Sequence, residues 1–117
     1  MFNRRTHVRV HPSPVEPLIA QISGDDFMEE FDVRDISAGG VGVVAADMFA
    51  VFAVNTPIEV VIKLPREGAF VARGVIRHIS RQGMLGIEFT QLAEIDRLRV
   101  ENYVARRSRE GGLAAFA

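Results

Sequence analysis

The sequence IEVVIKL at residues 58–64 gives the clearest strand signal in the chain, because Ile, Val, Ile and Leu alternate with Glu, Val and Lys. A period of two is typical of a strand with one buried face. A turn sequence, Pro-Arg-Glu-Gly at residues 65–68, follows at once, and residues 70–79 then alternate in the same way. This part of the chain therefore predicts two neighbouring antiparallel strands.

Four further segments show strand patterns, and turn sequences rather than helices separate most of them. They are residues 18–23, 27–34, 41–46 and 84–89. Residues 35–40 predict a turn, since Ser-Ala-Gly-Gly tolerates positive φ, and Glu29 interrupts the alternation of its strand as a β-bulge would. Six short strands predict a mainly β fold, a six-stranded antiparallel β-barrel, because closure removes the exposed edges of a small sheet.

Residues 91–109 are the one good helix candidate, since they are rich in Leu, Ala, Glu and Arg. Thr90 is the expected N-cap, and Gly111-Gly112 should end the helix. We expect this C-terminal α-helix to pack on the barrel, with a docking surface for a partner or a second copy as the alternative. The apolar residues expected to face the barrel are Leu92, Ile95, Leu98 and Tyr103.

The chain is thus divided into four parts. They are a flexible arginine-rich arm at residues 1–14, a β-barrel at 15–90, the helix at 91–109 and a tail at 110–117. Pro12 and Pro14 prevent a helix from forming in the arm. With no acidic residue before Glu16, the arm should stay mobile until an anion binds to it.

Composition places the chain among ordinary globular domains. It has 117 residues, a net charge of −1 and no cysteine, which predicts one domain without disulfides. Near-zero net charge argues against general nucleic-acid binding, which needs a broad basic surface. We see no signal peptide and no apolar stretch long enough for membrane insertion. We therefore expect a cytoplasmic protein.

Two short motifs carry most of the chemistry. Arg5 and Arg9 are four residues apart near the start, and Asp35, Ser37 and Gly40 follow in one stretch. An arginine can fork onto phosphate oxygens or onto the guanine O6/N7 edge. A carboxylate suits the guanine N1–H and N2–H₂ donors, a serine can bond to a phosphate or base, and glycine lets the backbone approach closely. The alternative readings are a solvated basic arm and a turn carboxylate that bonds to its own backbone.

These motifs resemble the signature of the PilZ domain, Arg-x-x-x-Arg followed by Asp/Asn-x-Ser-x-x-Gly. The sequence LGIEF at residues 85–89 also looks like the last strand of that family, so the resemblance covers roughly residues 4–89. It implies binding of cyclic di-GMP, a bacterial second messenger, under an N-terminal loop that folds over the ligand. Arg4, directly before the first motif, implies by the same resemblance an intercalated dimer of the ligand.

Catalysis is not expected from this sequence. It has no cysteine nucleophile, no Gly-x-Ser-x-Gly elbow and no phosphate-binding loop around its only lysine, Lys63. His7 and His11 lack a clustered third ligand type, so we expect no metal site. We also expect no cofactor beyond the cyclic di-GMP ligand.

The resulting hypothesis is a non-catalytic cyclic di-GMP receptor whose arm orders on ligand binding and signals to an unidentified downstream protein in motility or biofilm control. The main alternative is a PilZ-like adaptor in type IV pilus or motility control that does not bind the nucleotide. A small barrel for single-stranded nucleic acid is the third, and it lacks the expected aromatic ladder.

Overall fold

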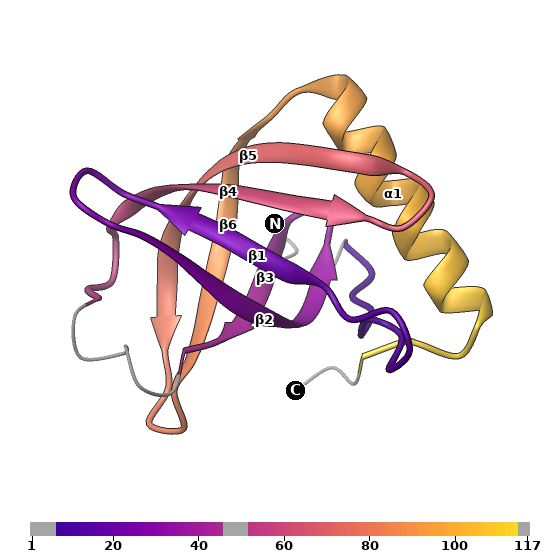
Figure 1. The fold of residues 1–117 in the computed structure, drawn as a ribbon, viewed down its shortest axis with the longest axis horizontal. Helices are drawn as coiled ribbons and strands as arrows, with labels where there is room; N and C mark the ends of the chain where they lie inside the picture. The colour runs from indigo at the N-terminus through magenta and orange to yellow at the C-terminus, as the bar shows by residue number, and fades with distance from the viewer. Residues whose placement is uncertain (1–6, 46–51, 115–117) are drawn as a thin grey trace, which may run out of the picture.

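The computed structural model describes residues 7–45 and 52–114, and most of them belong to six strands and one helix (Figure 1). The strands are β1 (Ile19–Ser23), β2 (Met28–Ser37), β3 (Gly40–Val44), β4 (Pro57–Leu64), β5 (Gly68–Ile79) and β6 (Met84–Leu92), and the helix is α1 (Glu94–Arg109).

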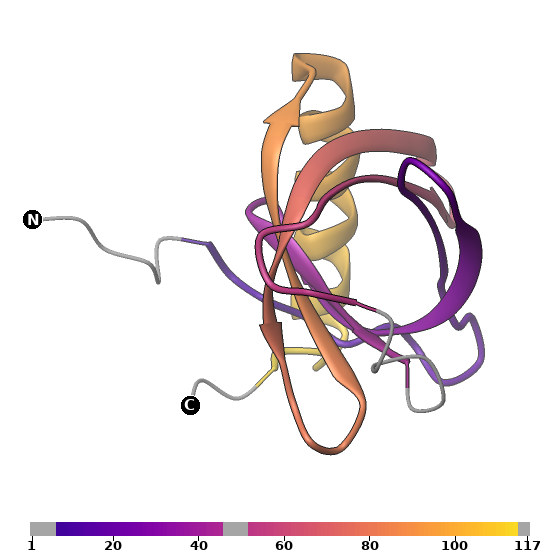
Figure 2. The same cartoon turned by 90° about the vertical axis from the view of Figure 1, so that its left-hand side faces the viewer.

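The strands form a closed antiparallel barrel in the order β1-β2-β3-β6-β5-β4. Figure 2 shows the strands curving around a central space with α1 alongside. Apolar side chains at alternate strand positions fill the interior, and Ile22, Val60 and Phe70 are fully buried there. Phe52, in the connection from β3 to β4, packs edge-on against Phe27, with ring centroids 5.3 Å apart. The predicted six-stranded antiparallel barrel is confirmed.

Strand β2 is longer than the sequence predicted. Residues 35–37, which we had assigned to a turn, remain paired with β3, and the turn is confined to Ala38 and Gly39. The bulge was also misplaced, because Glu29 pairs regularly with Ile22 and the register shifts between Val33 and Asp35 instead. Bulges re-aim the side chains around them, and this one lies directly beside the first residue of the second motif.

Helix α1 begins later than predicted. Thr90 is not an N-cap, because β6 continues to Leu92 and the helix starts after Ala93, which makes no side-chain capping bond. The prediction of which helix residues face the barrel was also partly wrong, since Ile95 and Leu98 are exposed. Near the C-terminal end, Arg106 donates to the carbonyl oxygen of Pro65 at 3.0 Å, which ties the helix to the β4–β5 turn. The residues of α1 that are buried are Val100, Tyr103, Val104 and Arg107.

The end of the predicted mobile arm is docked on the barrel. Val10 is fully buried and exchanges two backbone hydrogen bonds with Ile36, at 3.0 and 2.9 Å. On its other side, Val10 pairs with Leu113 of the predicted tail, and Ala114 donates to the carbonyl oxygen of Arg9 at 2.9 Å. The chain from Arg9 onward therefore differs from the expected exposed arm, because Val10 supplies an apolar anchor. Residues 1–6 and 115–117 lie outside the described residues.

In the described part of the chain, no helix combines the length and apolarity needed to cross a membrane.

Two glycines at the β2–β3 connection, Gly39 in the turn and Gly40 at the start of β3, have steric rather than conformational roles. The turn was predicted because its glycines tolerate positive φ, but neither Gly39 nor Gly40 has a positive φ. A Cβ atom at Gly40 would overlap the backbone carbonyl oxygen of Ile87 on β6, whereas one at Gly39 would lie 2.7 Å from the ring of His7. Gly40 thus allows β3 to approach β6, and Gly39 makes room for a side chain.

This difference predicts unequal effects of the two alanine substitutions. Gly40→Ala should lower the free energy of unfolding by about 1–3 kcal/mol, because two paired backbones must separate. Gly39→Ala should cost less than about 1 kcal/mol, since the exposed His7 ring can move aside. Urea denaturation of both variants measures the two losses, and equal losses would contradict the steric assignment.

Candidate ligand-binding site

The structure brings one arginine of the first motif against two residues of the second. Arg9 contacts one carboxylate oxygen of Asp35, Oδ1, through both Nε at 3.1 Å and Nη2 at 2.9 Å. Its Nη1 lies 3.4 Å from the Ser37 hydroxyl, which also accepts a hydrogen bond from the Gly39 N–H at 3.0 Å. Asp35 and Ser37 are buried, while the Arg9 side chain is about one-third exposed. The cluster therefore presents a guanidinium to solvent above a carboxylate and a hydroxyl.

Local backbone pairing sets this geometry. Val10 and Ile36 are hydrogen-bonded partners in an antiparallel bridge, so Arg9 comes to lie opposite Ser37, and its long side chain reaches diagonally to Asp35. His11 adds a second tie, because its Nδ1 lies 2.8 Å from the carbonyl oxygen of Arg34. Arg9 is thus held at the barrel by the chain that follows it.

Arg34 is a member of the cluster that the sequence analysis missed. Its Nε lies 3.3 Å from Oδ2 of Asp35, and more than half of its side chain is exposed. Asp35 therefore has one guanidinium on each carboxylate oxygen. Adjacent residues of a regular strand point to opposite faces, but the register of β2 shifts between Val33 and Asp35. This bulge lets Arg34 reach the carboxylate of its neighbour Asp35.

A hollow of about 460 Å³ opens beside this cluster. Arg9, Arg34 and Asp35 form one wall, and residues of the β5–β6 hairpin form the other. Gly42 lies between them, where a Cβ atom would be 2.9 Å from Oδ1 of Asp35. The residues that line the hairpin side are His78, Ser80, Gln82, Met84, Leu85 and Gly86. The wall thus offers two cations beside one carboxylate, which suits an anionic ligand with hydrogen-bond donors.

The other predicted site residues are placed less directly. Arg4 and Arg5 lie outside the described residues, so the structure gives no position for them. Gly40 lies in β3 next to β6, where its structural role is explained by the carbonyl oxygen of Ile87. Whether it also contacts a ligand stays a prediction.

Two other groups of polar residues, the arginines of β5 and the candidate metal ligands, do not join the site. Arg77 bonds to Glu88 at 2.6 Å and to Asn55 at 2.9 Å, and neither Arg73 nor Arg77 lines the hollow. Within the described ranges 7–45 and 52–114, no three His, Cys, Asp or Glu side chains cluster as metal ligands. His11 is engaged with a backbone carbonyl oxygen rather than free.

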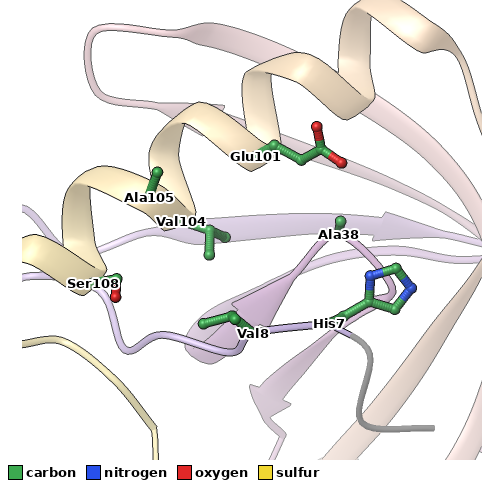
Figure 3. Close-up of a pocket in the computed structure, with 7 residues that line it drawn as sticks. All are labelled: His7, Val8, Ala38, Glu101, Val104, Ala105 and Ser108. Atoms are coloured by element: carbon green, nitrogen blue, oxygen red, sulfur yellow. The ribbon is translucent and has the colours of Figure 1, made fainter. Parts of the chain in front are cut away.

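A second hollow, of about 410 Å³, lies between the arm and α1. Figure 3 shows His7 and Val8 of the arm, with Ala38 of the β2–β3 turn, on one side of this space. The helix residues on its other side are Glu101, Val104, Ala105 and Ser108. Residues 7–9 of the arm therefore contribute to both hollows, with His7 and Val8 at one and Arg9 at the other.

Comparison with solved structures supports the same fold. The inhibitor of motility MotI/DgrA of Bacillus subtilis superimposes with a TM-score of 0.78 and 26% identity, over 93% of this chain and 53% of that chain. The PilZ domain of YcgR from Escherichia coli, solved with c-di-GMP, gives a TM-score of 0.72 and 17% identity, over 93% of this chain and 95% of that chain.

Sequence comparisons agree with this result. An uncharacterized protein of Aquifex aeolicus is 29% identical over an alignment of 123 residues, which covers 93% of this chain and 53% of the relative. The chain thus spans about half the length of this relative and of MotI/DgrA. The PilZ domain family model matches residues 3–106. The chain therefore belongs to the PilZ domain family.

Proposed function

We propose that this chain is a non-catalytic receptor for cyclic di-GMP. The observation that carries the proposal is the contact of Arg9 with Asp35 and Ser37 at the edge of an open hollow. The YcgR domain that shares its fold was solved with the same compound. Motility is the process we favour, since one similar protein is an inhibitor of motility.

The ligand would exchange contacts with the residues of this cluster. A guanine N1–H and N2–H₂ edge needs an acceptor, and Asp35 is a buried acceptor at the hollow. Both of its oxygens are already occupied, so one guanidinium has to give way. Arg34 is the one we expect to leave, because it makes a single, longer contact and is more exposed than Arg9. Arg9 and the preceding Arg5 and Arg4 would then bind phosphate oxygens.

Ligand binding would be transmitted through the arm. Residues 7–9 contribute to both hollows, so closure of the arm over a ligand at Arg9 would also move His7 and Val8. The second hollow would change shape, and we propose that an unidentified partner protein reads this change. Ordering of the residues around Arg4 and Arg5 on binding, and a cytoplasmic setting, belong to the same proposal.

Titration calorimetry with three ligands tests the receptor function. Cyclic di-GMP, cyclic di-AMP and a short oligonucleotide are titrated into wild type, the double variant Arg5→Ala/Arg9→Ala and the control Arg97→Ala on α1. Wild type and control should bind only the guanine compound. The double variant should lose about a hundredfold or more in affinity, because each bidentate contact contributes roughly 1–3 kcal/mol.

Other outcomes identify the alternatives. A wild type that binds none of the three ligands would favour the nucleotide-independent adaptor. Binding of the oligonucleotide without base preference would favour a single-strand binding protein. Thermal unfolding of each variant confirms that a loss of binding is not a loss of fold.

Stoichiometry provides a separate prediction for Arg4. If Arg4 helps to hold an intercalated ligand dimer, wild type should bind two cyclic di-GMP molecules per chain and Arg4→Leu should bind one. The added guanidinium offsets the charge repulsion between stacked phosphates. Calorimetric titration of both proteins gives the ratio, and a value near one for each would remove the dimer from the proposal.

A further inference from the structure

Four residues from four strands form one continuous row across the barrel. Asp35 of β2 pairs with Gly42 of β3, Gly42 pairs with Gly86 of β6, and Gly86 pairs with His78 of β5. All four line the larger hollow. Neither glycine of the row takes part in the two sequence motifs, and neither does His78.

The two central positions of the row have no side chains for a reason of space. Gly42 and Gly86 do not have positive φ, so backbone conformation does not require glycine at either position. A Cβ atom at Gly42 would lie 2.9 Å from Oδ1 of Asp35, and one at Gly86 would lie 3.2 Å from the Cβ of His78. The row therefore has no side chain of its own at its two central positions; the carboxylate of Asp35 extends over Gly42 at one end, and His78 stands beside Gly86 at the other.

The width and chemistry of this row suit a single purine. Three inter-strand steps separate Asp35 from His78, about 14 Å between backbones. The carboxylate can only accept hydrogen bonds, whereas the imidazole can donate one. Guanine has donors at N1 and N2 on one edge and an acceptor at N7 on the opposite side. His78 is exposed and lines the hollow, so its ring is accessible to a ligand there.

We propose that one guanine of the ligand lies over Gly86, between the two ends of the row, with its N1/N2 edge at the Asp35 carboxylate and its N7 at His78. This inference rests on the proposed function and adds a specificity-determining residue to it. The protein would then bind two opposite edges of the same base. Adenine could not replace guanine, because its N1 is an acceptor and would face the acceptor oxygens of the Asp35 carboxylate.

A modified ligand isolates the contact at N7. Cyclic di-GMP and its 7-deaza analogue, in which a C–H group replaces N7 in both guanines, are titrated into wild type, His78→Ala and His78→Gln. With the natural ligand, His78→Ala should bind roughly three- to tenfold more weakly, as expected for one lost hydrogen bond. His78→Gln should recover part of the loss, because its amide also donates.

The double comparison separates this contact from a general effect of the substitution. Wild type should lose affinity for the 7-deaza ligand, whereas His78→Ala should bind both ligands equally. If replacing the natural ligand by the 7-deaza ligand lowers the affinity of wild type and of His78→Ala by the same factor, the proposed N7 contact is wrong. Arg73→Ala, an exposed arginine on the same strand, serves as the control and should bind as wild type does.

A second variant tests the space over Gly86. Gly86→Val should abolish most of the cyclic di-GMP binding, because the added methyl groups fill the hollow. Since its Cβ would lie 3.2 Å from the Cβ of His78, thermal unfolding is measured beside the titration to separate lost binding from lost fold. Unchanged affinity in a folded Gly86→Val protein would overturn the placement of the base. If wild type binds cyclic di-GMP but His78→Ala and Gly86→Val bind it equally well, only this inference fails. If wild type does not bind it, the proposed function fails.

Discussion

The docking of Val10 between β2 and the C-terminal segment is the constraint on which the site depends. Val10 is fully buried and its backbone bonds to Ile36 while it also pairs with Leu113. An apolar residue in this position holds the chain by burial and by hydrogen bonds together, which makes separation costly. Because the bridge is antiparallel, the same docking places Arg9 opposite Ser37, from where its guanidinium reaches the buried carboxylate of Asp35.

Burial of Asp35 then determines the electrostatics of the site. A buried carboxylate is costly unless it is paired, and Asp35 has a guanidinium on each oxygen. Asp35 is thus already satisfied within the chain, and the ligand that we propose would have to compete for an occupied acceptor. Such competition would favour a ligand that brings hydrogen-bond donors for the carboxylate and an anionic group for the displaced arginine. A ligand with only one of these groups would leave either the carboxylate or the arginine unpaired.

Much of this arrangement could be predicted from the sequence, and the limits have physical reasons. Alternation at residues 58–64 indicated a half-buried strand, and the two motifs identified Arg9, Asp35 and Ser37. Cross-strand register is not encoded locally, so the sequence could not show that Gly42, Gly86 and His78 form one row with Asp35. The same limit hid Arg34, whose position depends on a bulge. Val10 was missed because the prolines after it suggested an exposed arm.

The attachments of the arm also limit where a ligand could cause movement. His11 donates to the carbonyl oxygen of Gly112 at 2.7 Å, and Arg107 of α1 donates to the carbonyl oxygen of His11 at 2.9 Å. Together with Val10, these contacts fix the arm on the C-terminal side of Arg9. Rearrangement on ligand binding would therefore be concentrated before Val10, in the segment that includes His7 and Val8. Since those two residues line the hollow against α1, a fixed pivot at Val10 would convert occupancy at Arg9 into a change at the helix surface.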